Sequence, residues 1–457
     1  MTGYTNPVPI GDIPEGWKIQ SIDSLCRNIT SGGTPLRSIS RFYQNGTIKW
    51  IKTKELKDWY IDDSEEKITE EALEESSAKL FPPNTVLMAM YGDGRTITSL
   101  GILRTESATN QACCALIANP DICDHLYLFY SLKYHRADFI QLATGGAQRN
   151  LSGTLIRNFA IRVPPLVEQH AIARILSSLD DKIELNRRMN ETLEAIARAI
   201  FKSWFVDFDP VRAKAEGQVP VGMDSETAAL FPDSFEETEL GMVPKGWIVG
   251  KLGEYLSNFD SKRVPVSGAE RSKRKGHYPY HGAAGIMDYI DDYLFDGIYV
   301  LIGEDGSVIQ ENGLAVTQYV WGKFWANNHA HVLQGKGAVS TEQLYLYFHF
   351  ETVAPYITGA VQPKLSQGRM NEMPFLFAGD AICSAFAGLI LPLFELLRAN
   401  ADCSTSLIAL RDTLLPDLIS GKSLLMENLL SKQSLSDTSS FKGRNKEESY
   451  VIQTNIY

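Results

Sequence analysis

The sequence lacks the features that would place it outside the soluble globular proteins. Its 457 residues include only six cysteines, none in a CxxC pair or in the spacing of a disulfide framework, so we expect reduced thiols in a cytosolic protein. The amino-terminal residues lack the basic start and apolar centre of a signal peptide. The longest apolar run, residues 385–397, is too short for a bilayer and contains Pro392. We therefore expect a soluble, cytoplasmic protein with no membrane contact.

Positive charge is scarce as well. The formal net charge is −11, and residues 215–244 contain no lysine or arginine. The acidic residues of that segment are Glu216, Asp224, Glu226, Asp233, Glu236, Glu237 and Glu239. Net charge argues only weakly against a nucleic-acid partner, because the local field decides where a phosphate backbone can lie and other stretches are basic. Charge alone leaves such a partner open.

Motifs for catalysis are also missing. The sequence "VPPL" at Val163 lacks the amide or acid that an adenine methyltransferase needs at this place. The sequence "SGKS" at Ser420 has Pro416 where a phosphate-binding loop requires its first glycine. The histidines include the strand pair His329 and His331, which lacks acidic or cysteine neighbours, and no cluster has metal-ligand spacing. We expect no catalytic residue and no metal site in this chain.

What the sequence does contain is a repeat. "IPEGW" at residues 13–17 returns as "VPKGW" at residues 243–247, about 230 residues later. Both halves then read as short β-branched and aromatic runs punctuated by glycine and proline, which is typical of a mixed, strand-rich domain. Further landmarks recur in order: "YGDG" from Tyr91 and "GEDG" from Gly303, "NQACCAL" from Asn110 and "NHAHVL" from Asn328, "YLFY" from Tyr127 and "YLYF" from Tyr345, "GAQRNLS" from Gly146 and "AVQPKLS" from Ala360.

A coiled-coil pattern follows each half. Apolar residues recur at alternating steps of four and three residues over more than four heptads, the a/d spacing of a coiled coil. The first series is Ile172, Leu176, Leu179, Ile183, Asn186, Asn190, Leu193, Ala197, Ile200 and Trp204. The second keeps the same phase about 210 residues later, so that Asn190 matches Asn400. The chain is therefore predicted to be a tandem duplication of a globular domain followed by a long helix, with a shorter second half.

These residues resemble the DNA-specificity subunits of type I restriction-modification enzymes over roughly residues 10–425. The resemblance rests on "IPEGW", "SGGTP" (31–35), "IKWIKTKEL" (48–56), "ITEEAL" (68–73), "ATNQACCAL" (108–116), "VPPLVEQHAIARIL" (163–176), "LDDKIELN" (179–186), "FVDFDPVRAKAEG" (205–217) and "LRDTLLPDLISGK" (410–422). It implies an α+β fold with two tandem mixed, strand-rich target recognition domains. Each domain would be followed by a long helix, and the two helices would pack as an antiparallel coiled coil.

The expected domain boundaries follow from this resemblance and from the repeat. We expect target recognition domain 1 at 1–165, a first spacer helix at 166–205, an acidic linker at 206–242, target recognition domain 2 at 243–378, a second spacer helix at 379–422, and a polar, disordered tail at 423–457.

The resemblance also implies a function. Such a chain would be a non-catalytic, sequence-specific subunit that binds double-stranded DNA, reads a bipartite asymmetric site and directs its partners to it. Two modification (methyltransferase) subunits and the restriction (translocase and endonuclease) subunits would carry the chemistry. S-adenosylmethionine, ATP and Mg²⁺ would bind to those partners, and no cofactor would bind to this chain.

Candidate DNA contacts come from turns and basic stretches. Bases are read through donors and acceptors delivered into a groove, while basic residues grip phosphates and fix the register. The candidates of the first half are Thr34, Arg37, Lys52, Lys54, Arg95, Gln148, Arg149 and Asn150. Those of the second half are Lys262, Arg263, Arg271, Lys273, Arg274, Lys275, His281 and Lys364. For any one lysine or arginine a solvated surface charge is the alternative.

The helices would act as a ruler. About 39 residues at ~1.5 Å rise span roughly 58 Å, which can hold two half-sites about one DNA turn, ~34 Å, apart. The buried Asn190 and Asn400 would fix the helix register at some cost in stability.

Two other functions remain open on the sequence alone. The chain could be a coiled-coil protein-interaction scaffold without DNA specificity. It could also hide a nuclease built from Asp58, Glu65 and Lys67, although such triplets are common on charged surfaces.

Overall fold

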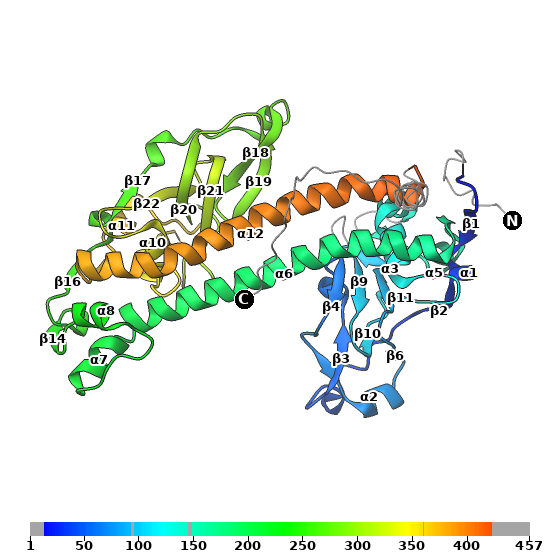
Figure 1. The fold of residues 1–457 in the computed structure, drawn as a ribbon, viewed down its shortest axis with the longest axis horizontal. Coiled ribbons are helices and arrows are strands. Elements are labelled where there is room, and N and C mark those ends of the chain that lie inside the picture. Colours follow the sequence, from blue (N-terminus) through cyan, green and yellow to red (C-terminus); the bar gives the residue numbers. More distant parts are fainter. Residues whose placement is uncertain (1–12, 93–95, 145–148, 360, 423–457) are drawn as a thin grey trace, which may run out of the picture. The chain divides into compact units, whose positions relative to one another are not determined.

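The computed structural model describes residues 13–92, 96–144, 149–359 and 361–422. The chain divides into two compact units, unit 1 with residues 1–184 and 405–457 and unit 2 with residues 185–404. The division falls inside the two long helices, α6 (Leu166–Phe205) and α12 (Asp380–Ser420). Each unit therefore consists of a globular head and a segment of each helix (Figure 1).

The head of unit 1 is built on two sheets. One has the order β2-β11-β7-β9-β4, with strands Cys26–Ser31, Cys113–Ala118, Val86–Ala89, Leu100–Leu103 and Trp59–Ile61, antiparallel except for the parallel pair β9 and β4. The other has the order β5-β3-β10-β6, with strands Lys67–Ile68, Ile48–Ile51, Ser107–Thr109 and Leu80–Phe81. Two pairs complete the head, β1 (Lys18–Ser21) with β13 (Ala160–Val163) and β8 (Tyr91–Gly92) with β12 (Arg149–Asn150).

The central strands of that head are apolar throughout because both of their faces are buried. In β7, Val86 and Met88 face one hydrophobic cluster, while Leu87 and Ala89 face another. The helices around the sheets are α1 (Ile22–Leu25), α2 (Glu70–Glu74), α3 (His125–Tyr134), α4 (Arg136–Leu142) and α5 (Gly153–Asn158).

The head of unit 2 contains one six-stranded sheet. Its order is β17-β22-β20-β21-β18-β19, with strands Leu256–Asn258, Ala330–Gly335, Phe295–Gly303, Thr317–Ala326, Lys275–Gly282 and Gly285–Ile290. Two strand pairs lie beside it, β16 (Ile248–Lys251) with β23 (Pro374–Phe377) and β14 (Phe235–Thr238) with β15 (Gly241–Pro244). The helices are α7 (Asp209–Ala215), α8 (Ser225–Leu230), α9 (Gly268–Arg271), α10 (Thr341–Tyr347) and α11 (Gln367–Asn371).

The long helices run antiparallel within each unit. In unit 2, the Nδ2 atom of Asn400 donates to Oδ1 of Asn190 at 3.0 Å, and Asn186 reaches the Asn400 carbonyl at 3.2 Å. In unit 1, Arg411 of α12 pairs with Asp180 of α6 at 2.5 Å. The predicted fold class is confirmed: two mixed, strand-rich heads, each followed by a long helix, with the helices packed antiparallel.

Burial along α12 is uneven. Ile382 and Phe386 are buried, whereas Leu389, Leu396 and Leu410 are 47%, 42% and 48% exposed. A two-helix pair covers only one narrow stripe of each helix, so seam residues far from a head keep one side open. Within the described part of the chain, α12 is also long and apolar enough to suit a membrane crossing, a property that core helices of soluble proteins share.

Residues 206–242, expected as an acidic linker, contain regular structure. They form α7, α8, β14 and the start of β15. Phe231 from this segment packs edge-on against Trp204, with ring centroids 5.0 Å apart. The segment is therefore part of the hydrophobic core of unit 2.

Candidate nucleic-acid interface

Two loops that the sequence repeat singles out meet in unit 1. Arg149 and Asn150 of β12 pair antiparallel with Gly92 and Tyr91 of β8. The backbone N–H of Leu151 donates to the Met90 carbonyl at 2.9 Å, which continues the pairing. The described parts of "YGDG" and "GAQRNLS", residues 91–92 and 149–152, lie about 57 residues apart in sequence and thus form one surface. Arg149 and Asn150 are both exposed there.

The corresponding loops of unit 2 meet in the same way. Asp305 and Lys364 form an antiparallel bridge, and the N–H of Gly306 donates to the Pro363 carbonyl at 3.2 Å. Gln362 adds a side-chain contact, because its Nε2 donates to Oδ1 of Asp305 at 2.8 Å. The duplicated motifs therefore converge on an equivalent place in both heads, although the side chains presented there differ.

A pocket lies beside each pair of loops. In unit 1 its volume is about 470 Å³ and its wall is formed by Ile29, Thr30, Ser31, Met90, Tyr91, Cys114, Asn150, Leu151, Ser152, Gly153, Thr154 and Arg157. In unit 2 its volume is about 430 Å³ and its wall is formed by Ala283, Ala284, Gly285, Ile286, Met287, Asp305, Gly306, Ser307 and His329. The first wall is rich in hydroxyl groups, while the second combines apolar side chains with one carboxylate.

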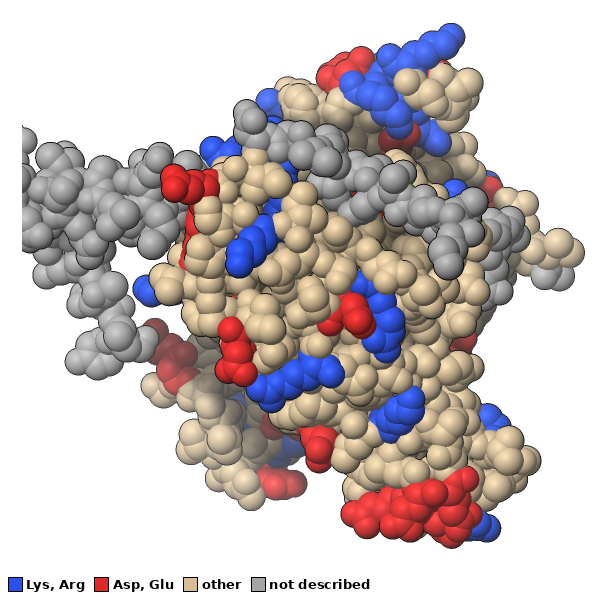
Figure 2. Space-filling view, turned by 90° about the vertical axis from the view of Figure 1, so that its right-hand side faces the viewer, with Lys and Arg blue, Asp and Glu red and all other residues tan. Residues whose placement is uncertain are grey.

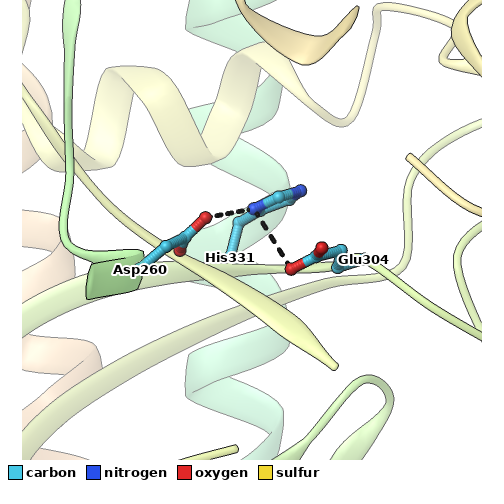
Figure 3. Close-up of side chains that lie close together, drawn as sticks. All are labelled: Asp260, Glu304 and His331. Carbon is cyan, nitrogen blue, oxygen red and sulfur yellow. Dashed lines mark hydrogen bonds and ion pairs between the residues drawn. The ribbon is translucent and has the colours of Figure 1, made fainter. Parts of the chain in front are cut away.

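A buried charge network lies under the loops of unit 2 (Figure 3). His331 Nδ1 is 2.5 Å from Oδ2 of Asp260 and 3.7 Å from Oε2 of Glu304. Burial raises the pKa of Asp260, but the hydrogen bond and charge of His331, together with hydrogen bonds from the Val332 N–H and the Asn258 side chain, lower it overall. The expectation that His331 lacks acidic neighbours was wrong, because both acids come from distant parts of the sequence.

This trio could in principle hold a metal ion, since its ligand atoms all lie within 4.8 Å of one another. However, Arg263 already pairs with Glu304 at 2.7 Å and lies 3.4 Å from Asp260. Nε2 of His331 faces the Leu365 carbonyl at 2.8 Å, so both ring nitrogens are directed at oxygen acceptors. The Arg263 guanidinium contacts both acids, and both ring nitrogens of His331 face oxygen acceptors, so the cluster forms an internal ion-pair network. This network holds Glu304, the residue before Asp305.

The predicted basic contacts of the first half mostly carry acidic partners. Arg37 and Lys52 form ion pairs with Glu66, and Lys54 pairs with Glu65. The hydrogen bond from Arg37, together with that from Lys52, lowers the pKa of Glu66 to about 2. The Thr34 hydroxyl donates to Gln111. The predicted contacts Arg95 and Gln148 are outside the residues that the structure describes.

In unit 2 the predicted basic residues gather at the base of the β18–β19 hairpin. Arg271 and Lys275 pair with Asp288 at 3.4 and 2.6 Å, and Arg274 pairs with Asp291 at 2.9 Å. Among the residues that the structure describes, Lys273 forms no ion pair. Three others are placed differently: the Lys262 ammonium lies 5.2 Å from the Phe259 ring, Arg263 is in the buried network, and Lys364 is 49% exposed and 3.5 Å from Glu304.

His281 does not present its ring on the surface. It is 6% exposed, and its Nδ1 lies 2.9 Å from Oε1 of Gln318. The nuclease triplet is not assembled either, because Asp58 pairs with Arg136, Glu65 with Lys54, and Lys67 with Asp63.

On the face that Figure 2 shows, basic side chains do not join into one stripe. Figure 2 shows lysine and arginine as separate groups with acidic side chains between them on the face in view. Ion pairs of this exposed kind contribute little to stability, so a DNA phosphate can compete for their cations at small cost. The residues that sequence reasoning missed are Asp305, Gln362 and the apolar pair Ile286 and Met287. The repeat could have pointed to the first two.

Comparisons with known proteins identify the family that this chain resembles and proteins of similar fold. The family model described as type I restriction modification DNA specificity domain matches residues 14–195 and 244–376. The HindI specificity subunit of Haemophilus influenzae is 52% identical over 329 residues, covering 58% of this chain and 70% of that protein. The MjaIX specificity subunit of Methanocaldococcus jannaschii is 27% identical over 433 residues, covering 90% and 95%. The crystal structure of a type I system S subunit from M. genitalium superimposes with a TM-score of 0.55 at 17% identity, covering 91% of this chain and 99% of that one.

Proposed function

The chain belongs to the family of type I restriction-modification DNA specificity subunits, and from this premise we propose that each head reads one half of a split, asymmetric DNA site. The enzymatic activities of such systems lie on other subunits, so this chain supplies recognition rather than catalysis.

One observation carries the proposal: the duplicated loops form the same pairing in both heads but present different groups. Arg149 and Asn150 stand on the pair in unit 1. Asp305, Gln362 and Lys364 stand on the pair in unit 2. Arginine can form two hydrogen bonds with guanine, and asparagine can form two with adenine. A carboxylate instead accepts a hydrogen bond from a base amino group, such as that of cytosine. Two equivalent surfaces with unlike chemistry favour a site whose two halves differ in sequence.

The helices hold each head through buried polar contacts. In unit 1, the Tyr130 hydroxyl donates to Oδ2 of Asp180 on α6 at 2.8 Å. In unit 2, the Tyr345 hydroxyl donates to Oε1 of Glu194 on α6 at 2.7 Å. Since α6 and α12 are continuous, we propose that they fix the length of an unread spacer between the half-sites. Asn190 and Asn400 then serve to set the register.

The same helices offer a surface for partners. Leu185 and Ile196 of α6 are 52% and 43% exposed, and Leu389 and Leu396 of α12 are exposed to a similar degree. Exposed apolar residues grouped on helices mark interaction sites. We propose that two modification subunits dock there and that restriction subunits join them, in the cytoplasm. S-adenosylmethionine, ATP and Mg²⁺ would then be bound by these partners.

A matched pair of variants tests the proposal. The chain is assembled with its modification subunits, and its affinity is measured for the methylated-site sequence and for versions scrambled in either half. We expect Arg149→Ala to lower affinity for one half and Lys364→Ala to lower affinity for the other, each by about tenfold, the loss of one good contact. Loss of affinity in the same half for both variants would contradict the assignment of one head to each half.

The same assay distinguishes a DNA specificity subunit from a protein-interaction scaffold without DNA specificity. A scaffold would bring the modification subunits together without preferring any DNA sequence. Equal affinity of the assembled complex for the site and for a fully scrambled duplex, measured at several salt concentrations, would favour the scaffold.

A further inference from the structure

The β18–β19 hairpin of unit 2 ends in an apolar tip, and we propose that Met287 and Ile286 at this tip recognise the C5-methyl group of a thymine in the major groove. This inference rests on the proposed function and adds a specificity-determining contact to it. A two-stranded ribbon fits the major groove, where the thymine methyl group distinguishes an A·T pair from the others.

The exposure of these side chains needs an explanation. Ile286 and Met287 are 50% and 56% exposed, and Tyr289 on the same strand is 50% exposed. The strand β19 is an edge of the six-stranded sheet. Apolar edge strands invite aggregation, and proteins usually protect such edges with charges or bulges. Exposed apolar side chains at the tip of this edge hairpin therefore indicate that they contact a binding partner.

The tip is held from beneath by the half-buried Gln318 and the buried His281. Gln318 donates through Nε2 to the carbonyls of Gly282 and Ala283, at 2.8 and 3.1 Å. His281, predicted to contact DNA, instead holds Gln318 through its Nδ1. The tip is thus fixed before binding, which lowers the entropic cost of recognition.

Met287 itself is also held. Asn327, which is 4% exposed, directs its Nδ2 at the Met287 sulfur at 3.5 Å. The Asn327 backbone N–H donates to the His281 carbonyl at 3.0 Å, so the amide is anchored to the neighbouring strand β18. An exposed methionine with a positioned sulfur has fewer arrangements to lose than a free one.

The surroundings favour a base edge over a phosphate. The tip shares its pocket with Asp305, Ser307 and His329, and the Asp305 carboxylate would repel a phosphate but can accept from a base amino group. The nearest basic side chains, Lys275 and Arg271, already pair with Asp288, the residue after Met287. These cations can exchange their acidic partner for phosphates that flank the groove.

The surface fits DNA better than a protein partner. It is continuous with the Asp305–Lys364 loop pair, which carries the proposed readout in this head. Three exposed apolar side chains also fall far short of the ~800 Å² per partner that a stable protein interface buries.

Deoxyuridine, which lacks the methyl group, provides the test. In the half-site whose recognition depends on Lys364, each thymine is replaced singly by deoxyuridine, and binding of the assembled complex is measured. We expect one replacement to weaken binding about fourfold, the effect of burying one methyl-sized group. Met287→Ala should bind the thymine duplex about fourfold more weakly than the wild type does. This variant should also bind the thymine and deoxyuridine duplexes with equal affinity. Met287→Leu should restore the distinction, and Ile248→Ala, at an exposed position on β16, should behave as wild type.

Each outcome decides between the proposals. Specific binding that no deoxyuridine changes, or a half-site without thymine, would overturn this inference and leave the proposed function intact. Weaker assembly of Met287→Ala with the modification subunits, with unchanged thymine preference, would overturn it in favour of a protein contact. The absence of any sequence-specific binding by the wild-type complex would instead refute the proposed function itself.

Discussion

Tyr130 allows a quantitative test of how the head of unit 1 is attached to the helices. Its side chain is fully buried in α3, and its hydroxyl donates to Asp180, which is 5% exposed. Asp180 also accepts from Arg411 of α12 at 2.5 Å. Tyr130→Phe keeps the ring and its edge contact with Phe129 but removes the hydroxyl. The substitution therefore isolates one hydrogen bond that joins the head to the helix pair.

The expected loss follows from the charge of the acceptor. A hydrogen bond to a charged group contributes about 1.5–3 kcal/mol to the free energy of unfolding. With a urea m-value of about 3 kcal/mol per molar, a loss of about 2 kcal/mol lowers the unfolding midpoint of unit 1 by roughly 0.7 M. Equilibrium urea unfolding, followed by tryptophan fluorescence and far-ultraviolet circular dichroism, measures this shift.

A matched control exists in the same head. The Tyr60 hydroxyl lies 3.2 Å from Nε2 of His125. Burial lowers the pKa of His125, so this ring is a neutral partner at neutral pH. Tyr60→Phe should cost about 0.5–1.5 kcal/mol, the range for neutral pairs. If Tyr130→Phe shifts the midpoint no further than Tyr60→Phe, the hydrogen bond to the buried Asp180 carboxylate does not hold the head on the helices.

Two further predictions address the charges and the spacer. The pKa of Glu66 is lowered from 4.5 to about 2, mainly by its hydrogen bond with Arg37, so its contribution to stability is complete above about pH 4.5 and is lost as the pH falls through 2. Glu66→Gln should lack this acid-dependent step in unfolding measured between pH 2 and 6, and an unchanged pH profile would contradict it. Inserting one heptad after Leu193 in α6 and one after Leu396 in α12 adds about 10 Å to both helices, or roughly three base pairs. We expect methylated sites with a spacer longer by that amount, and an unaltered spacer would refute the ruler.

The long helices and the duplication could be predicted because their signals are local or periodic. The heptad spacing alone matched Asn190 to Asn400 as equivalent positions of the repeat, and the structure shows in addition that the two side chains contact each other. The repeat also located the segments around Asp305 and Lys364, although their direct pairing became visible only in three dimensions. Periodicity does not show where a head covers the helix, and Leu389 and Leu396 are 47% and 42% exposed.

Most of the candidate site depends on contacts that sequence distance hides. In the sequence, Arg263 lies in a basic stretch with no obvious acidic partner. In the structure it pairs with Glu304, which is 41 residues away in the chain. His331 reads as an isolated histidine, yet Asp260 lies 71 residues away. The sequence shows how many basic residues a stretch contains, but it does not show which acidic residues pair with them in the folded protein. Exposed apolar residues such as Met287 give no signal either, because in a strand they look like core.

The central claim is that two unlike heads read two separated half-sites. Sequencing of methylated adenines in cells that carry this chain with its modification subunits tests it most directly. We predict a motif with two specified parts of different sequence, separated by a run of unspecified bases of constant length. A continuous motif, or two identical halves arranged as a palindrome, would contradict the account.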